Sequence, residues 1–422
     1  MRSAKDMSDE DWASLTWEIG DTFTPAAPLN EADLFAGRLD QLKKLLDATS
    51  ERGKHAILYG ERGVGKTSLS GLLHKLFPPI PRHIFSIRVQ ADPSDNFDSI
   101  WRKAFKDIWV TIEREDGSGE IQRSLDQLYP SAILPDDVRR ELQVVFKPSQ
   151  VPIIIIDEFD KIEDELALSL MANTIKALSD YSVNVTVIIV GVAADVNELI
   201  KEHESIQRCI EQVPMPRMSV PERIEIIERA LKKLAMTIEP DGLSKAAYLS
   251  RGLPSYVHAL GQYAALSAVA RRSLNITAKD VEAAISRVLQ KSQETVQESY
   301  AKAVHSNRND SMYREVLLAC ALAETDDRGT FTPTSVCGPL TTILGRNKEV
   351  QISAFQQHLQ KFITDERGRI LGRRGMERSY KYRFEDPMMQ PYVIMKGIEQ
   401  GLISPSFLEA VAYPAQPRLP SI

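Results

Sequence analysis

One glycine-rich segment restricts the possible folds of this chain more than any other feature. The segment reads Gly60-Glu61-Arg62-Gly63-Val64-Gly65-Lys66-Thr67, and it fits the pattern G-x-x-x-x-G-K-[ST] at every fixed position. An apolar run at residues 55–59 precedes it, and leucines at helical spacing follow it. Glycines allow successive N–H groups to point inward, and the positive end of the following helix adds to their attraction for an anion. The sequence therefore predicts a phosphate-binding loop between a strand and a helix, rather than a chance glycine turn.

The side chains of this loop predict how a nucleotide would be held. Lys66 is expected to reach the β- and γ-phosphates of a purine nucleoside triphosphate, and the Thr67 hydroxyl is expected to bind magnesium. The loop backbone and the next residue, Ser68, complete the expected contacts. ATP and Mg²⁺ are the predicted cofactors.

A second part of this site is predicted where a long apolar run ends in two acids. Residues 151–156 are continuously apolar, as expected of a strand buried on both faces, and Asp157 and Glu158 follow directly. Asp157 is expected to hold the metal, and Glu158 to polarise the attacking water as a general base. A buried strand that ends in a solvated acidic turn would look the same in isolation. Together with the phosphate loop, the two acids favour hydrolysis over binding alone.

Strands and helices alternate in the first half of the chain, which predicts a parallel α/β sheet. The expected strands lie at residues 55–59, 84–89, 151–156 and 185–190, and the expected helices at 34–46, 69–76, 100–112 and 166–178. Only helices are expected next, at 224–234, 256–270 and 281–289. Helical patterns at 313–323 and 352–363 then precede two β-like segments at 370–373 and 379–384. The prediction is an α/β P-loop NTPase core with a parallel sheet, a small helical lid domain and a C-terminal winged-helix domain.

The corresponding domain boundaries follow from these changes of pattern. We expect an N-terminal arm at 1–30, the core at 31–217, the lid at 218–305, the winged-helix-like domain at 306–402 and a flexible tail at 403–422. The arm carries Trp12, Trp17 and Phe23, which favour an arm that folds onto a larger body, although a loose terminus is an equal alternative.

Composition points to a protein of the cytoplasm. The three cysteines are odd in number and lack metal-binding spacing, so we expect free thiols in a reducing compartment. No apolar run approaches the length of a membrane span, and the N-terminus lacks the apolar core of a signal peptide. The formal net charge of −6 means that any contact with DNA needs a local basic patch.

From Asp33 to Ser292 the sequence resembles the AAA+ ATPases. The likeness is greatest to the initiator-type branch, which contains origin-recognition ATPases and bacterial relatives linked to transposition. Phe35-Ala36-Gly37-Arg38 is similar to the segment that those proteins place over the adenine, which implies that Phe35 contacts the base. AAA+ proteins also place an arginine near the end of the core to contact the γ-phosphate of a neighbouring chain. The resemblance implies that Arg208 has this role in a homo-oligomer, with Arg217 as second choice and a plain surface arginine as the alternative.

Two positions depart from the origin-recognition pattern. The segment Val190-Gly191-Val192 lacks the Asn or Thr that these proteins carry at the end of the fourth strand. Ser255 stands where they have an arginine, and Arg251 and His258 are the possible substitutes. Gly252-Leu253-Pro254 resembles instead the signal-transduction NTPases of immune and apoptotic switches, in which the proline contacts the base. The likeness implies the same role for Pro254. The two altered positions favour a slow switch over a motor.

Residues 360–384 are strongly basic in an otherwise acidic chain. On a winged helix, cations of the hairpin track DNA phosphates. The candidate DNA-binding residues are Arg373, Arg374, Arg378 and Lys381. A solvated hairpin and a protein-docking surface are the alternatives.

Two functions remain open from the sequence. The first is an oligomeric ATPase that engages double-stranded DNA. The second is the regulatory or sensor ATPase of a bacterial antiviral defence or mobile-element system, which would act through a separately encoded effector protein. No nuclease, protease, TIR or deaminase motif is visible in the sequence, so an effector would have to be encoded elsewhere.

Overall fold

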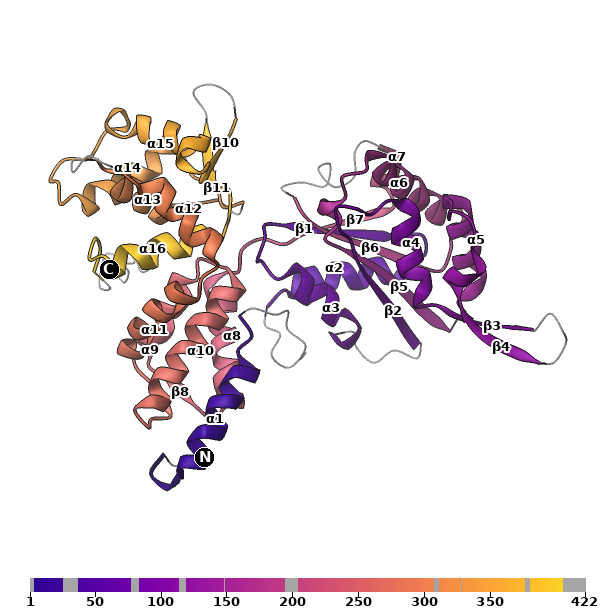
Figure 1. Cartoon of the computed structure of the whole chain (residues 1–422), viewed down its shortest axis with the longest axis horizontal. Helices are drawn as coiled ribbons and strands as arrows, with labels where there is room; N and C mark the ends of the chain where they lie inside the picture. Colours follow the sequence, from indigo (N-terminus) through magenta and orange to yellow (C-terminus); the bar gives the residue numbers. More distant parts are fainter. Residues whose placement is uncertain are drawn as a thin grey trace, which may run out of the picture.

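The computed structural model describes residues 4–25, 37–76, 83–113, 119–147, 149–193, 204–306, 311–326, 328–375 and 380–404 (Figure 1). A five-stranded parallel sheet forms the centre of the α/β part, with the order β2-β5-β6-β1-β7. Its strands are β1 (His55–Gly60), β2 (His83–Gln90), β5 (Gln150–Asp157), β6 (Thr186–Val192) and β7 (Ile210–Pro214). The predicted parallel α/β core is thereby confirmed, and β7 is a strand that the sequence patterns did not predict.

Alternate residues of the central strands pack on opposite faces of the sheet, because successive side chains of a strand point to opposite sides. Leu58, Ile153 and Ile155 share one buried cluster with the helices α2 (Leu39–Ser50) and α3 (Lys66–Leu76). Ile57, Ile154 and Ile156 share a second cluster. Its helices are α4 (Phe97–Lys106), α5 (Pro135–Val145) and α6 (Glu165–Asp180). Apolar cover on both faces explains why residues 151–156 are apolar without alternation.

The helix expected at residues 100–112 is partly wrong. Helix α4 ends at Lys106, and β3 (Trp109–Glu113) pairs antiparallel with β4 (Glu120–Ser124) in a hairpin that projects from the core (Figure 1). Ile100, Trp101 and Ala104 keep the three-to-four residue spacing of a buried helix face. From Trp109 onward burial alternates with a period of two, which is the pattern of a strand.

A group of helices follows the sheet and lies beside it in Figure 1. It consists of α8 (Val220–Lys233), α9 (Pro240–Leu249), α10 (Pro254–Ala270) and α11 (Ala278–Lys291). The shorter α7 (Glu204–Gln207) precedes β7 and belongs with the core, where it contacts α6 and β7. The expectation of helices alone was not fully met, because β8 (Thr237–Ile238) and β9 (Asn275–Ile276) form a short parallel pair.

The N-terminal residues form helix α1 (Asp9–Thr22), which packs on α10. Ser8 and Asp11 form a capping box at its start, and Leu15 and Ile19 are fully buried. The Phe23 ring lies where a side chain at Gly261 would stand, because an added Cβ there would be 2.4 Å from the ring. The prediction of an arm that folds onto a larger body is therefore confirmed for residues 4–25.

The last described part combines five helices with one hairpin. The helices are α12 (Glu294–Val304), α13 (Tyr313–Leu322), α14 (Pro333–Ile343), α15 (Gln356–Phe362) and α16 (Met389–Glu399). Strands β10 (Leu371–Arg374) and β11 (Lys381–Phe384) form the hairpin, close to the two β-like segments expected there. The helix expected at 352–363 is instead a 3₁₀ turn (Ile352–Ala354) followed by α15. Within the described residues, every helix is too short or too polar to cross a lipid bilayer.

Candidate nucleotide-binding site

The glycine-rich loop joins the end of β1 to the start of α3, as the sequence predicts. Gly60 is required because a Cβ there would lie 2.4 Å from the carbonyl oxygen of Met215. Gly65 has a φ of 97°, a backbone conformation that residues other than glycine rarely adopt. The Lys66 Nζ donates to the carbonyl oxygens of Gly60 at 2.9 Å and Glu61 at 2.8 Å, so its ammonium lies over the loop.

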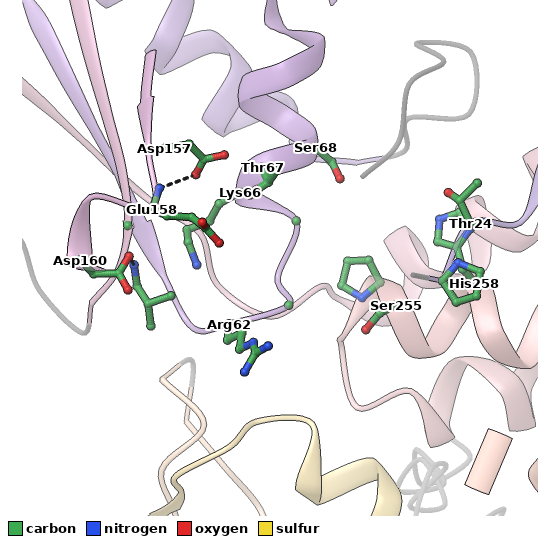
Figure 2. Close-up of a pocket in the computed structure, with 16 residues that line it drawn as sticks. Thr24, Arg62, Lys66, Thr67, Ser68, Asp157, Glu158, Asp160, Ser255 and His258 are labelled. Carbon is green, nitrogen blue, oxygen red and sulfur yellow. Dashed lines mark hydrogen bonds between the residues drawn. The ribbon is translucent and has the colours of Figure 1, made fainter. Parts of the chain in front are cut away.

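A cavity of about 240 Å³ opens beside this loop (Figure 2). Its lining comes from five separate parts of the chain, namely residues 24–25, 62–68, 157–160, 191–192 and 254–258. The cavity thus brings together the predicted residues Arg62, Gly63, Gly65, Lys66, Thr67, Ser68, Asp157, Glu158 and Pro254. Phe35 and Arg378 lie outside the described residues.

The Asp157 carboxylate is buried at the end of β5 and is already paired. Its Oδ2 accepts from the Arg88 guanidinium at 2.6 Å, and its Oδ1 accepts from the backbone N–H of Glu158 at 2.9 Å. Arg88 comes from the neighbouring strand β2. A hydroxyl and a carboxylate are hard oxygen donors, so Thr67 and Asp157 suit Mg²⁺. A metal at Oδ2 would compete with Arg88 for the same oxygen.

Glu158 is held by two donors. Its Oε2 accepts from the Gln90 amide at 2.7 Å and from the Lys161 ammonium at 2.8 Å. Burial alone would raise the pKa of this carboxyl, but the hydrogen bonds from Lys161 and Gln90 outweigh it and lower the pKa below its usual value. Glu158 is therefore ionised at neutral pH.

Asp160 is a residue of this cavity that the sequence reasoning missed. It lines the cavity beside Asp157 and Glu158, and its Oδ1 accepts from the Val192 N–H at 2.7 Å. This bond joins the ends of β5 and β6 at the place where a polar residue of β6 was expected. A third acid, three residues after the first, was the available signal in the sequence.

The arginine candidates lie in different environments. Arg208 is 71% exposed, pairs with Asp180 at 2.6 Å and does not line the cavity. A contact from Arg208 to a neighbouring chain stays a prediction. Arg217 is nearly buried, donates to Glu61 of the phosphate loop at 2.7 Å and also donates to the side-chain oxygen of Gln390 in α16.

The two possible substitutes for the arginine that Ser255 replaces also differ. Arg251 donates to the carbonyl oxygen of Ala323 and does not line the cavity, whereas His258 does. On the hairpin, Arg373 and Arg374 are exposed, the Arg373 guanidinium lies 4.2 Å from the Tyr380 ring centre, and Lys381 pairs with Asp326 at 3.0 Å.

We predict that ATP affinity falls as the pH rises above about 8. Burial lowers the pKa of Lys66 to about 8, although the carboxylates of Asp160, Asp157 and Glu61 oppose this effect. Above that pH Lys66 loses its proton in the empty protein, whereas the phosphates of a bound nucleotide would keep Lys66 protonated. Binding then takes up a proton, so affinity should fall by up to roughly tenfold per pH unit. Calorimetric titration across this range measures the effect.

The variant Lys66→Arg is the control for this experiment, because a guanidinium stays charged throughout the range. Its affinity, even if lower, should not vary with pH. A flat profile for the unaltered protein would contradict the prediction.

A parallel sheet with this loop at the end of one strand and the acid pair at the end of another defines a P-loop NTPase. More narrowly, the chain belongs to the family described as novel STAND NTPase 1, whose model matches residues 27–364. This membership agrees with the resemblance of residues 252–254 to signal-transduction NTPases. No curated protein matches the chain.

Several solved structures are similar to this chain at low sequence identity. The Aeropyrum pernix ORC2 protein, solved as ADPNP-ADP complexes, has 14% identity and a TM-score of 0.48 over 90% of this chain and 97% of that chain. A Walker-type ATPase of Pyrococcus abyssi also has 14% identity and a TM-score of 0.48, over 88% of this chain and 99% of its own. The Thermotoga maritima RuvB Holliday junction branch migration motor has 15% identity and a TM-score of 0.43, over 89% and 98%.

Proposed function

We propose that this protein binds ATP with Mg²⁺, hydrolyses it slowly to ADP and phosphate, and acts as a nucleotide-controlled switch in the cytoplasm. Lys66 would bind the phosphates, Thr67 and Asp157 would hold the metal, and Glu158 would activate water. The convergence of these four side chains on one cavity supports the assignment. Arg88 and the donors to Glu158 occupy both acids, which supports a slow basal rate.

One observation supports the proposed switch: Arg217 contacts both the phosphate loop and α16. It joins Glu61 to Gln390, and Met388 of the same region lies against Gly63, because a Cβ added at Gly63 would be 3.3 Å from the Met388 sulfur. A rearrangement of the loop around a triphosphate would therefore change contacts with the C-terminal region. We assign residues 31–217 as the ATPase core, 218–305 as the lid and 306–402 as a winged-helix domain that receives this signal.

The output that we favour is binding to double-stranded DNA by an oligomer. Arg373, Arg374 and Lys381 supply cations on the β10–β11 hairpin, which suits phosphate contacts. The exposed Arg208 suits a contact with the site of a neighbouring copy.

A second candidate output is an effector protein, as in an antiviral defence or mobile-element system. The membership of the novel STAND NTPase 1 family and the Gly252-Leu253-Pro254 segment favour it.

The proposed function predicts that ATP turnover rises with duplex DNA, and that Arg373→Ala/Arg374→Ala removes this response. The double variant should weaken DNA retention about tenfold and reduce the magnitude of the salt slope by roughly two. Its basal ATPase rate should not change, because neither residue lines the cavity. Turnover, filter retention and native mass with ATP and Mg²⁺ are the measurements.

The matched control is Lys43→Ala/Lys44→Ala, which removes two adjacent exposed cations from α2. DNA retention that is equal in both double variants would sink the hairpin assignment. Absence of any DNA response in the unaltered protein, with tight ATP retention, would favour the effector instead.

A further inference from the structure

The nucleotide cavity has a second end, away from the phosphate loop, to which neither the loop nor the acid pair contributes. Figure 2 shows Thr24 beside His258 there, with Ser255 between them and Arg62 of the loop. His258 comes from α10, and Thr24 follows α1 in the N-terminal arm. Thr24 also precedes residues 27–364, which match the family model, so the family match does not cover this contribution to the cavity.

Both side chains at this end carry a buried polar atom without a hydrogen-bond partner. The Nε2 of His258 and the Oγ1 of Thr24 are such atoms, and the His258 side chain is buried, with a residue exposure of 3%. Buried polar atoms in native proteins are nearly always paired, so these two atoms, whose residues both line one cavity, are suited to pair with a polar ligand bound there.

The hydrogen bond to the other ring nitrogen of His258, Nδ1, determines which nitrogen carries the proton. The Thr24 backbone N–H donates to Nδ1 at 3.4 Å, so Nδ1 is an acceptor and the proton belongs on Nε2. Burial lowers the pKa of His258 to about 4, which keeps the ring neutral at physiological pH. The ring therefore presents an N–H donor without a positive charge.

The arm is attached firmly enough to place these atoms. The Phe23 ring occupies the space above Gly261 and meets the His258 ring edge-on, with 6.0 Å between ring centres. The Gln262 amide donates to the Phe23 carbonyl oxygen at 3.1 Å. Packing and a backbone contact thus hold Thr24 against α10 before any ligand arrives.

We propose that Thr24 and His258 recognise the base of a bound adenine nucleotide. The inference rests on the proposed function, since Lys66 and the loop would hold the phosphates at the opposite end. A neutral donor suits a base better than a phosphate. Adenine has two edges that include its amino group. On each of them the amino group, which donates a hydrogen bond, lies next to a ring nitrogen that accepts one. The His258 Nε2–H donates to the ring nitrogen, and the Thr24 hydroxyl accepts from the amino group.

The test compares ATP with inorganic tripolyphosphate, which has the phosphates but no base. In calorimetric titrations with Mg²⁺, Thr24→Val and His258→Leu should each weaken ATP binding about 10- to 100-fold. Tripolyphosphate binding should not change. The preference for ATP over GTP should also fall in Thr24→Val, because guanine has an oxygen in place of the amino group.

The matched control is Thr16→Val, which removes a hydroxyl from the same arm, where it donates to the Trp12 carbonyl oxygen at 2.9 Å away from the cavity. It should bind ATP normally, and its melting temperature indicates whether an arm hydroxyl matters to folding. Unchanged ATP affinity in both Thr24→Val and His258→Leu overturns the proposal. Equal weakening of ATP and tripolyphosphate also overturns it. If the unaltered protein binds neither ligand, the proposed function itself fails, and this inference fails with it.

Discussion

Replacing Lys66 with alanine is expected to abolish ATP binding at ordinary concentrations. The Lys66 ammonium lies over the phosphate loop, and it is expected to meet two phosphates of the nucleotide. Hydrogen bonds to charged groups contribute about 1.5–3 kcal/mol each. Losing two of them lowers affinity by roughly 10²- to 10⁴-fold. Calorimetric titration of ATP with Mg²⁺ measures this loss.

The same replacement should not destabilise the empty protein. Burial lowers the pKa of Lys66 below that of an exposed lysine, so the folded state is penalised for holding the charge at neutral pH. Removing the ammonium relieves that penalty and gives up two hydrogen bonds to the loop carbonyls. A melting temperature close to that of the unaltered protein would show that binding, not folding, was lost.

Lys75→Ala is the matched control, because it removes a lysine from the far end of the same helix, outside the cavity. Its ATP affinity should equal that of the unaltered protein. If Lys66→Ala binds ATP as tightly as Lys75→Ala does, the assignment of this loop to the phosphates is wrong.

The phosphate loop and the two acids could be predicted because their chemistry is local in the sequence. Residues 60–67 are contiguous, and the acids end an apolar strand. Parallel strands bring their carboxyl ends to one edge of the sheet, so two such motifs lie together without knowledge of the helices around them. Only β6 separates β1 from β5 in the sheet, and this arrangement places both motifs on one cavity.

The contacts that shape the rest of the site could not be predicted in this way. Thr24 and His258 are 234 positions apart, and Arg217 and Glu61 are 156 apart. Such pairs depend on how an arm and a group of helices dock on the core, and no local pattern encodes that geometry. The end of the helix expected at 100–112 was assigned wrongly for a related reason, because α4 stops at Lys106. Trp109 and Ile112 suit a helix or a strand, and their pairing with β4 decides the outcome.

Glu158→Gln is expected to leave ATP binding intact and to reduce turnover by roughly 10²- to 10⁴-fold, the usual contribution of a general base. Glutamine keeps the size of the side chain and an oxygen that can accept from Gln90 and Lys161, so the local structure should persist. It cannot take a proton from water. Single-turnover hydrolysis of pre-bound ATP, with nucleotide retention measured in parallel, separates the two effects.

Glu163→Gln provides the comparison, since it removes an exposed carboxylate from the same segment without touching the cavity. It should hydrolyse ATP at the ordinary rate. Normal hydrolysis by Glu158→Gln would mean that another group activates the water, and Asp160 would be the next candidate because it lines the same cavity. The hydrogen bonds from Lys161 and Gln90 that lower the pKa of Glu158 also make its carboxylate a weaker base. We therefore expect the unaltered protein to hydrolyse ATP slowly, and Glu158→Gln to hydrolyse it far more slowly still.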